Sequence, residues 1–166
     1  MNLLELPLIA TLRRNHGLEH ATIHVLSRRY PYLHLVGRST TDGFFIYGDV
    51  PTEAVASAAV EALQRLQAGE RHLALHPRCG TNLALAGLLA GLSSFVATWG
   101  KPRSFLNRLP RLILATTAAV MLAQPLGPII QERVTTSAEL DNVRVREVTR
   151  QQMGKVIIHR VQLQEV

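Results

Sequence analysis

The sequence predicts an α+β fold in which a small mixed α/β domain is interrupted by a two-helix transmembrane hairpin. Two charge-free runs support this, Cys79 to Gly100 and Leu112 to Gln131, because each is close to the ~20 residues that cross ~30 Å of hydrocarbon. The flanking segments instead carry the periodicities of amphipathic helices and half-buried strands. We expect residues 1–82 to hold the candidate site, 83–131 to form the hairpin, and 132–166 to supply strands that complete the first domain.

The elements before the hairpin follow from periodicity and from residues that begin or end helices. The Tyr30-Pro31 pair ends the first helix, since the residue before proline avoids helical dihedrals. The second helix has Pro51 in its first turn, is capped by Asp49 or Val50, and ends at Gly69. Short strands and a glycine-containing turn complete the segment. The expected elements are helices at about 7–29 and 51–69 and strands at 32–38, 44–47 and 72–76.

Both hydrophobic runs have small residues one turn apart, among them Gly87 and Gly91, and small faces let helices approach closely in lipid. Pro125 and Pro128 should kink or end the second helix. A buried helical hairpin in a soluble protein is the alternative interpretation of the two runs. Beyond the hairpin, strands are expected at about 142–149 and 155–164, with a turn at Met153-Gly154.

The net charge of +6 is concentrated in one short loop. Residues 101–111 contain four basic residues and no acid, and so supply four of the six excess charges. A nucleic-acid-binding surface needs a wide basic face, so we expect no nucleic-acid partner and a lipid bilayer instead. The bias of basic residues places this loop in the cytoplasm, yet exporting a long first segment without a signal peptide is difficult. The sequence thus favours an integral membrane protein with a cytoplasmic domain.

The segment His16-Gly17-Leu18-Glu19-His20 is the most informative motif. Histidines at i and i+4 share one helix face, and H-x-x-E-H is the inverted zincin pattern. His16 and His20 are therefore candidate metal ligands. Glu19 is a candidate catalytic base or a further ligand. The alternative is an ordinary polar helix face, on which these residues bind nothing.

A second cluster, His76-Pro77-Arg78-Cys79, offers two more ligands three residues apart, a spacing that suits a metal knuckle. With His16 and His20, these residues predict a site for a divalent metal, most consistent with zinc. Cys79 is the chain's single cysteine, so no intrachain disulfide can form, and a buried, inert thiol is the alternative. His24 extends the helix stripe, either as a residue that orients a metal ligand or, the interpretation we favour, as a solvated or capping residue. The remaining histidines, His34, His72 and His159, lack partner spacing.

These blocks carry a resemblance. H-G-L-E-H-A at 16–21, H-P-R-C-G-T-N at 76–82, and Val134-Thr135-Thr136 after the second membrane segment resemble the YqhQ-like bacterial membrane proteins. In that family a leucine-glutamine pair precedes the double threonine, and here Ile130-Gln131 takes its place. The resemblance implies a membrane protein that is a predicted metal-dependent enzyme of unknown function. It is weakest over about residues 32–70, and this chain is shorter than that family.

Two functions follow from these patterns. The first is a membrane-anchored zinc-dependent hydrolase or peptidase acting near the bilayer surface, with Glu19 as proton acceptor. The second is a non-catalytic accessory or assembly subunit of a membrane complex, in which a structural metal fixes the first helix. A third option has no metal, and the same groups bind a ligand or stabilise the fold by hydrogen bonds. If one ion is shared, the two motifs must converge to within ~8 Å.

Overall fold

A computed structural model describes residues 3–99 and 105–165 of the chain. The described residues form a mixed α/β structure with four α-helices and a four-stranded antiparallel sheet, which confirms the expected mixture of elements. The chain divides into two compact units. One comprises residues 1–76 and 132–166, and the other comprises residues 77–131. Two of the expected loop cations, Lys101 and Arg103, lie outside the described residues.

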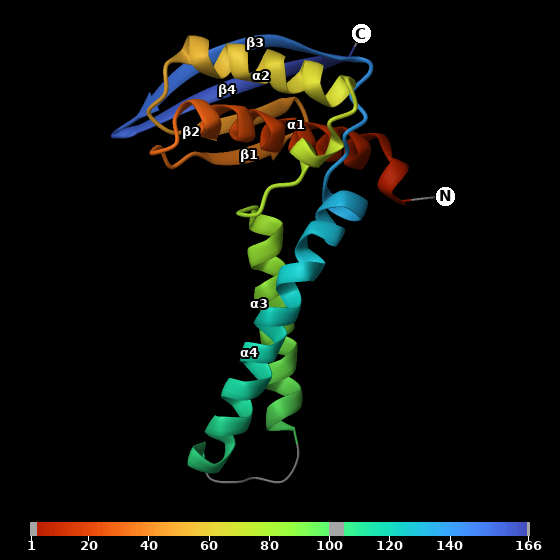
Figure 1. The fold of residues 1–166 in the computed structure, drawn as a ribbon, viewed down its shortest axis with the longest axis vertical. Coiled ribbons are helices and arrows are strands. Elements are labelled where there is room, and N and C mark those ends of the chain that lie inside the picture. The colour runs from red at the N-terminus through yellow and green to blue at the C-terminus, as the bar shows by residue number, and fades with distance from the viewer. Residues whose placement is uncertain (1–2, 100–104, 166) are drawn as a thin grey trace. The chain divides into compact units, whose positions relative to one another are not determined.

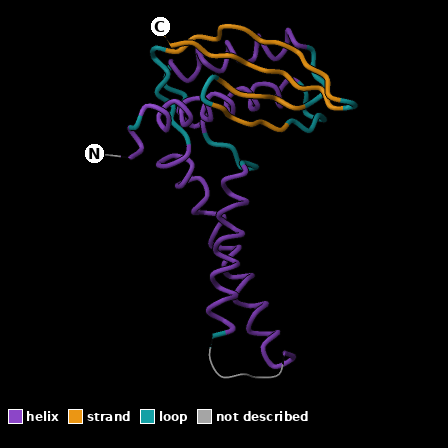
Figure 2. Tube along the Cα trace, turned by 180° about the vertical axis from the view of Figure 1, so that it is seen from behind, coloured by secondary structure: helices purple, strands orange, loops and turns teal. Residues whose placement is uncertain are grey.

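The first unit is a two-layer structure with helices on one face of a sheet (Figure 1). Helices α1 (Pro7–Arg29) and α2 (Thr52–Gln67) form the helical layer. The strand order is β1-β2-β4-β3, and Figure 2 shows the four strands side by side with both helices behind them. The strands are β1 (Val36–Thr40), β2 (Gly43–Tyr47), β3 (Val143–Met153) and β4 (Val156–Glu165).

The core of this unit lies between the helices and the sheet. Apolar residues recur every three or four positions along α2, so one stripe of that helix is buried. Phe44 and Ile46 alternate along β2 and point to the same face. Val161 on β4 is paired with Phe44 and is fully buried. The buried helical residues include Leu18, Leu26, Val55, Ala59, Ala62 and Leu66.

The predicted strand at 72–76 is wrong. A short 3₁₀ helix, η2 (Arg71–Ala74), occupies this position, and the sheet contains no strand from this segment. The physical reason is that the backbone carbonyl groups of Ala74 and Leu75 accept hydrogen bonds from histidine side chains of α1. They are therefore not available to pair with a neighbouring strand.

The other boundaries in this unit agree more closely with expectation. α1 spans the predicted residues, and the C-terminal hairpin turns at Gly154 with φ 61°, where glycine adopts a left-handed conformation without strain. β1 begins only at Val36, so 32–35 lie before the strand. The N-cap of α2 is Pro51, without a side-chain cap, and not the predicted Asp49 or Val50.

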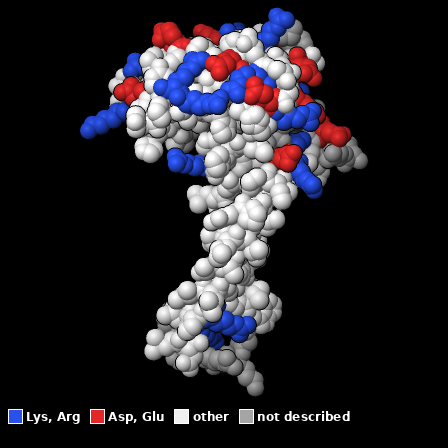
Figure 3. Space-filling model, in the orientation of Figure 1, with Lys and Arg blue, Asp and Glu red and all other residues white. Residues whose placement is uncertain are grey.

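The second unit is a pair of helices, α3 (Gly80–Thr98) and α4 (Phe105–Ile130), which lie side by side in both ribbon views (Figures 1 and 2). Both helices are long and apolar enough to cross a membrane. The face of these helices seen in Figure 3 is almost wholly uncharged, with basic residues near one end of the pair.

Of the two predicted effects of Pro125 and Pro128, a kink or an end of the helix, neither proline ends the helix. The helix contains Pro110, Pro125 and Pro128 and continues to Ile130. A π-helix, η3 (Gln131–Thr135), follows directly. The helical segment therefore extends beyond the length that the prolines indicated.

Candidate metal centre

Helix α1 places three histidines one turn apart on the same face, as the sequence predicts. His16, His20 and His24 follow the i, i+4, i+8 spacing within the 23-residue helix. The rings of His16 and His20 are in edge contact, with centroids 4.3 Å apart. His20 is buried, whereas His16 and His24 are half-buried. The stripe is thus buried at its centre and partly exposed at both ends.

Two of these rings, those of His16 and His20, are each hydrogen-bonded to a backbone carbonyl group through Nδ1. Nδ1 of His16 lies 2.9 Å from the carbonyl oxygen of Thr135. Nδ1 of His20 lies 2.8 Å from that of Ala74. A carbonyl only accepts, so Nδ1 must carry the proton in each ring, and in the neutral imidazole the lone pair then resides on Nε2. Metal-binding histidines in proteins are commonly oriented by this kind of hydrogen bond.

His76 converges with this stripe, although 56 positions separate it from His20 in the sequence. Its ring centroid lies 5.6 Å from that of His20 and 5.0 Å from that of His24. Two imidazoles that share an ion at ~2.0–2.1 Å have ring centres about 5 Å apart. The expected approach of the two motifs is therefore present for His20 and His76, well inside the ~8 Å limit.

Cys79 supplies the sulfur of the motif and begins the second unit's first helix. It is buried, and its Sγ accepts a hydrogen bond of 3.4 Å from the backbone N–H of Thr81, which caps α3. His16, His20 and Cys79 together form a group that could hold a metal ion. Imidazole nitrogen and thiolate sulfur are donors that zinc prefers.

Glu19 points toward β1. Its side chain is buried, and its Oε2 accepts a hydrogen bond from the Ser39 hydroxyl. Gly37 leaves the necessary space, since a Cβ atom at that position would lie 2.0 Å from Oε1 of Glu19. This local arrangement fixes the carboxylate between α1 and the first strand. The assignment of Glu19 as a catalytic base stays a prediction.

His24 also belongs to the histidine cluster, because its ring contacts His76 and is hydrogen-bonded to the backbone. Its Nε2 lies 2.8 Å from the carbonyl oxygen of Leu75, which places the proton on Nε2 and the lone pair on Nδ1. From the sequence we favoured a solvated or capping role for His24 over one in which it orients a metal ligand. The signal that points to it is the second i+4 step, from His20 to His24, considered together with the later His76.

The segment after the second unit packs on α1. The guanidinium of Arg13 donates to the carbonyl oxygens of Arg133 and Thr136 at 3.2 and 3.1 Å, and the N–H of Ser137 donates to the Arg13 carbonyl at 2.9 Å. A Cβ at Gly17 would lie 2.2 Å from the Ser137 carbonyl oxygen. Gly17 is therefore required for this close approach, and no local pattern in the sequence indicates that requirement.

The second motif also organises the helix pair. Nδ2 of Asn82 donates to the carbonyl oxygen of Pro77 at 2.9 Å. Nε2 of Gln131 donates to Oδ1 of Asn82 at 2.6 Å, and Gly127 gives the Asn82 side chain room. These contacts join the start of α3 to the end of α4. They explain structurally why an asparagine and a glutamine occur at the edges of the apolar runs.

The remaining histidines lie outside the cluster. His34 precedes β1 and His72 lies in η2, and both are exposed. His159, on β4, is fully buried. Burial lowers the pKa of His159 below its ordinary value, and the nearby Arg150 lowers it further, with a partial opposing effect from the backbone of Val50 and Gly48. His159 is thus a core histidine held in its neutral form.

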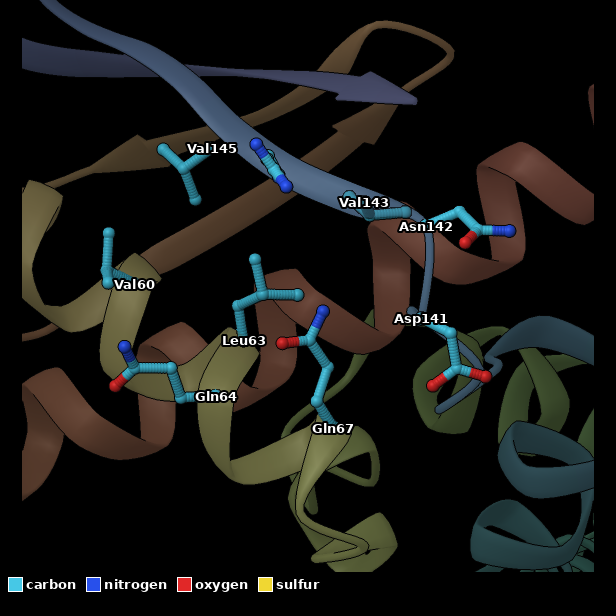
Figure 4. Close-up of a pocket in the computed structure, with 9 residues that line it drawn as sticks. Val60, Leu63, Gln64, Gln67, Asp141, Asn142, Val143 and Val145 are labelled. Atoms are coloured by element: carbon cyan, nitrogen blue, oxygen red, sulfur yellow. The ribbon is translucent and has the colours of Figure 1, made fainter. Parts of the chain in front are cut away.

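A separate hollow of about 520 Å³ lies between α2 and the start of β3. Figure 4 shows side chains of α2 facing residues 141–145 across it. Nε2 of Gln67 donates to the carbonyl oxygen of Leu140 at 2.9 Å, which closes one side. Its lining contains no histidine or cysteine, so it does not belong to the metal centre. The lining residues are Val60, Leu63, Gln64, Gln67, Asp141, Asn142, Val143, Arg144 and Val145.

Comparisons with known proteins point to a family of unknown function. The family DUF6391, described as a domain of unknown function, matches residues 11–148. An uncharacterised protein of Picosynechococcus sp. is 36% identical over 146 residues, which cover 82% of this chain and 71% of that protein. No solved structure matches the chain. The region that the family matches, residues 11–148, includes both histidine motifs and both apolar helices.

Proposed function

The chain belongs to the DUF6391 family, whose function is unknown, and from that premise we propose that it is a membrane-anchored protein that binds a divalent metal, most consistent with zinc. The observation that carries the proposal is the pair of carbonyl contacts at Nδ1 of His16 and His20. Both contacts place the metal-binding lone pair on Nε2 in advance. The ring of His76 adds a third imidazole at compatible spacing, and Cys79 adds a thiolate.

The membrane part of the proposal rests on composition and length. α3 and α4 form a separate unit, and their exposed side chains include Leu88, Leu92, Leu114 and Leu122. A soluble protein rarely exposes so many contiguous apolar side chains, whereas a bilayer solvates them. The domain of residues 1–76 and 132–166 is proposed to lie on the cytoplasmic side.

A structural role for the metal is best supported. Carbonyls of Ala74 and Thr135, which are far apart in sequence, already hold His20 and His16. A metal on the Nε2 atoms would fasten α1 to the segment that carries His76. Such an ion stabilises a small domain because the unfolded chain has no preformed site. The protein would then serve as an accessory or assembly subunit of a membrane complex.

A zinc-dependent hydrolase or peptidase is the second candidate, and the H-x-x-E-H spacing on α1 favours it. A zinc ion supplies a bound water of lowered pKa. In this reading Glu19 accepts the proton of that water. For that role the Glu19 carboxylate would have to give up its hydrogen bond with Ser39 in β1. The structural role needs no such movement, which is why we rank it first.

Metal analysis of the detergent-purified protein tests the proposal. We expect close to one equivalent of zinc in the wild-type protein, and a large loss in His16→Ala and His20→Ala. His34→Ala and His72→Ala are matched controls, because each removes an exposed histidine outside the cluster. Equal metal content in all five proteins would refute the site. Removal of the affinity tag before the measurement guards against metal taken up by the tag.

Glu19→Gln separates the two candidate roles. In the structural role this variant keeps the metal with modestly reduced affinity, and no hydrolytic activity is lost because none exists. In the hydrolase role it keeps the metal and loses turnover of peptide or ester substrates. Glu53→Gln, an exposed residue of α2, is the control for a removed carboxylate.

A further inference from the structure

An apolar groove of about 440 Å³ runs between α3 and α4. Small side chains contribute to its lining, among them Ala97, Ala115 and the buried Ala119, together with larger apolar side chains. Ser93 donates its hydroxyl to the carbonyl of Ala90 within its own helix. The lining is Leu89, Leu92, Ser93, Val96 and Ala97 from α3, and Arg111, Ala115, Ala119 and Leu122 from α4.

Arg111 is the one charged residue in this lining, and its side chain is exposed. The unit contains no aspartate or glutamate in residues 77–131, whereas it contains five lysines and arginines. No carboxylate of the helical unit can therefore neutralise Arg111. A second copy of the helix pair would bring further positive charge and no acid. The charge of the groove thus calls for an anion that this unit does not supply.

The length of the groove matches one leaflet of a bilayer. Arg111 and Leu122 are eleven positions apart on α4, which corresponds to ~16 Å along a helix. Half of a ~30 Å hydrocarbon core is about 15 Å. The rings of Phe95 and Trp99 pack edge to face at 5.0 Å near the end of α3, and aromatic residues favour the membrane interface. Arg111 would then lie at headgroup depth, with the apolar groove reaching inward.

We propose that this groove binds an anionic phospholipid, with one acyl chain between α3 and α4 and the phosphate paired with Arg111. The planar guanidinium donates two parallel hydrogen bonds to phosphate oxygens. Small side chains leave room for the acyl chain. This inference rests on the proposed membrane anchoring and is independent of the metal.

Trp99 is the single tryptophan of the chain and serves as the reporter. The full-length protein is reconstituted in phosphatidylcholine vesicles that contain a minor fraction of phosphatidylglycerol with brominated acyl chains, or the same fraction of brominated phosphatidylcholine. We expect Trp99 to be quenched more strongly by the anionic lipid. Arg111→Gln should reduce its relative affinity roughly fivefold, the effect of one charge near an anionic surface. Ala115→Leu, which fills the groove, should also reduce this preference.

Two control variants make the outcomes distinct. Arg78→Gln removes a cation of the same unit outside the groove, and Ala118→Leu adds the same bulk at an exposed position of α4. Equal quenching by both lipids in the wild type overturns the proposal, as does an equal effect of Arg111→Gln and Arg78→Gln. Quenching that falls as protein density rises would assign the groove to a second copy. Absence of quenching by either lipid would instead refute the membrane anchoring itself.

Discussion

Nδ1 of His20 lies 2.8 Å from the carbonyl oxygen of Ala74, a residue 54 positions later in the chain. This contact both orients the imidazole and anchors the segment before His76 on α1. It also replaces the strand pairing that the sequence led us to expect at 72–76. One hydrogen bond thus connects the architecture of the domain with the chemistry of the candidate site.

The carbonyl contacts predict different tautomers along a single helix face. His16 and His20 should carry the proton on Nδ1, and His24 on Nε2, because each ring donates to a backbone oxygen from that nitrogen. Nitrogen-15 NMR of histidine-labelled, metal-free protein distinguishes these tautomers by chemical shift. Added zinc should then shift the Nε2 signals of His16 and His20. An Nε2–H tautomer for His20 in the metal-free protein would contradict the geometry.

Gly17→Ala should destabilise the domain. The new Cβ would lie 2.2 Å from the backbone oxygen of Ser137, so the chain after η3 must move away from α1. Overpacking of this kind costs about 1–3 kcal/mol. Thermal unfolding in detergent measures the effect. Gly91→Ala is the control, since a Cβ there meets open space and alanine favours a helix. A Gly17→Ala protein as stable as wild type would contradict the close approach.

Asn82 and Gln131 should be energetically coupled. Their side chains are joined at 2.6 Å between the start of α3 and the end of α4. A double-mutant cycle with Asn82→Ala and Gln131→Ala should yield a coupling free energy of about 0.5–3 kcal/mol in unfolding experiments. Pairing Gln131→Ala with Thr116→Ala is the control, because the Thr116 hydroxyl bonds to its own helix. Strictly additive effects for Asn82 and Gln131 would count against a stabilising clamp.

The stability of the domain should decline in mild acid because of His159. Its pKa is lowered in the folded state by burial and by Arg150. Below the ordinary value of 6.5, the unfolded chain binds a proton that the folded chain does not, so the free energy of unfolding falls as pH decreases through that range. Above it, this contribution is constant.

Denaturant unfolding at several pH values, with a chelator present, measures this dependence. His159→Phe should show a flatter decline than wild type, whereas His34→Phe, at an exposed position, should retain the wild-type slope. Identical slopes for His159→Phe and the wild-type protein would show that His159 does not titrate differently on folding.

Local sequence signals predicted several elements well. α1 covers the expected residues because Pro7 begins a helix without losing a needed donor and Tyr30-Pro31 ends it. The hairpin of β3 and β4 turns at Gly154, where a positive φ is required. His16 and His20 lie together because helical geometry alone brings i and i+4 onto one face.

Long-range contacts account for what the sequence did not predict. The segment 72–76 has no local feature that favours a 3₁₀ helix, and its carbonyl partners come from α1. Pro125 and Pro128 are strong helix-ending signals, yet α4 continues past both into a π-helix. The need for Gly17 appears only once Ser137 lies against α1. The outcomes at 72–76 and at Gly17 depend on partners distant in sequence.

The sequence by itself therefore determined the helical spacing of His16 and His20, the two apolar helices, and the identity of the donors that could bind a metal. Only the tertiary structure decided which nitrogen of each histidine carries its proton, because that depends on the carbonyl groups of Ala74 and Thr135. It likewise decided that Glu19 faces Ser39. Periodicity is a property of neighbouring residues, whereas hydrogen-bond partners are set by the packing of distant segments.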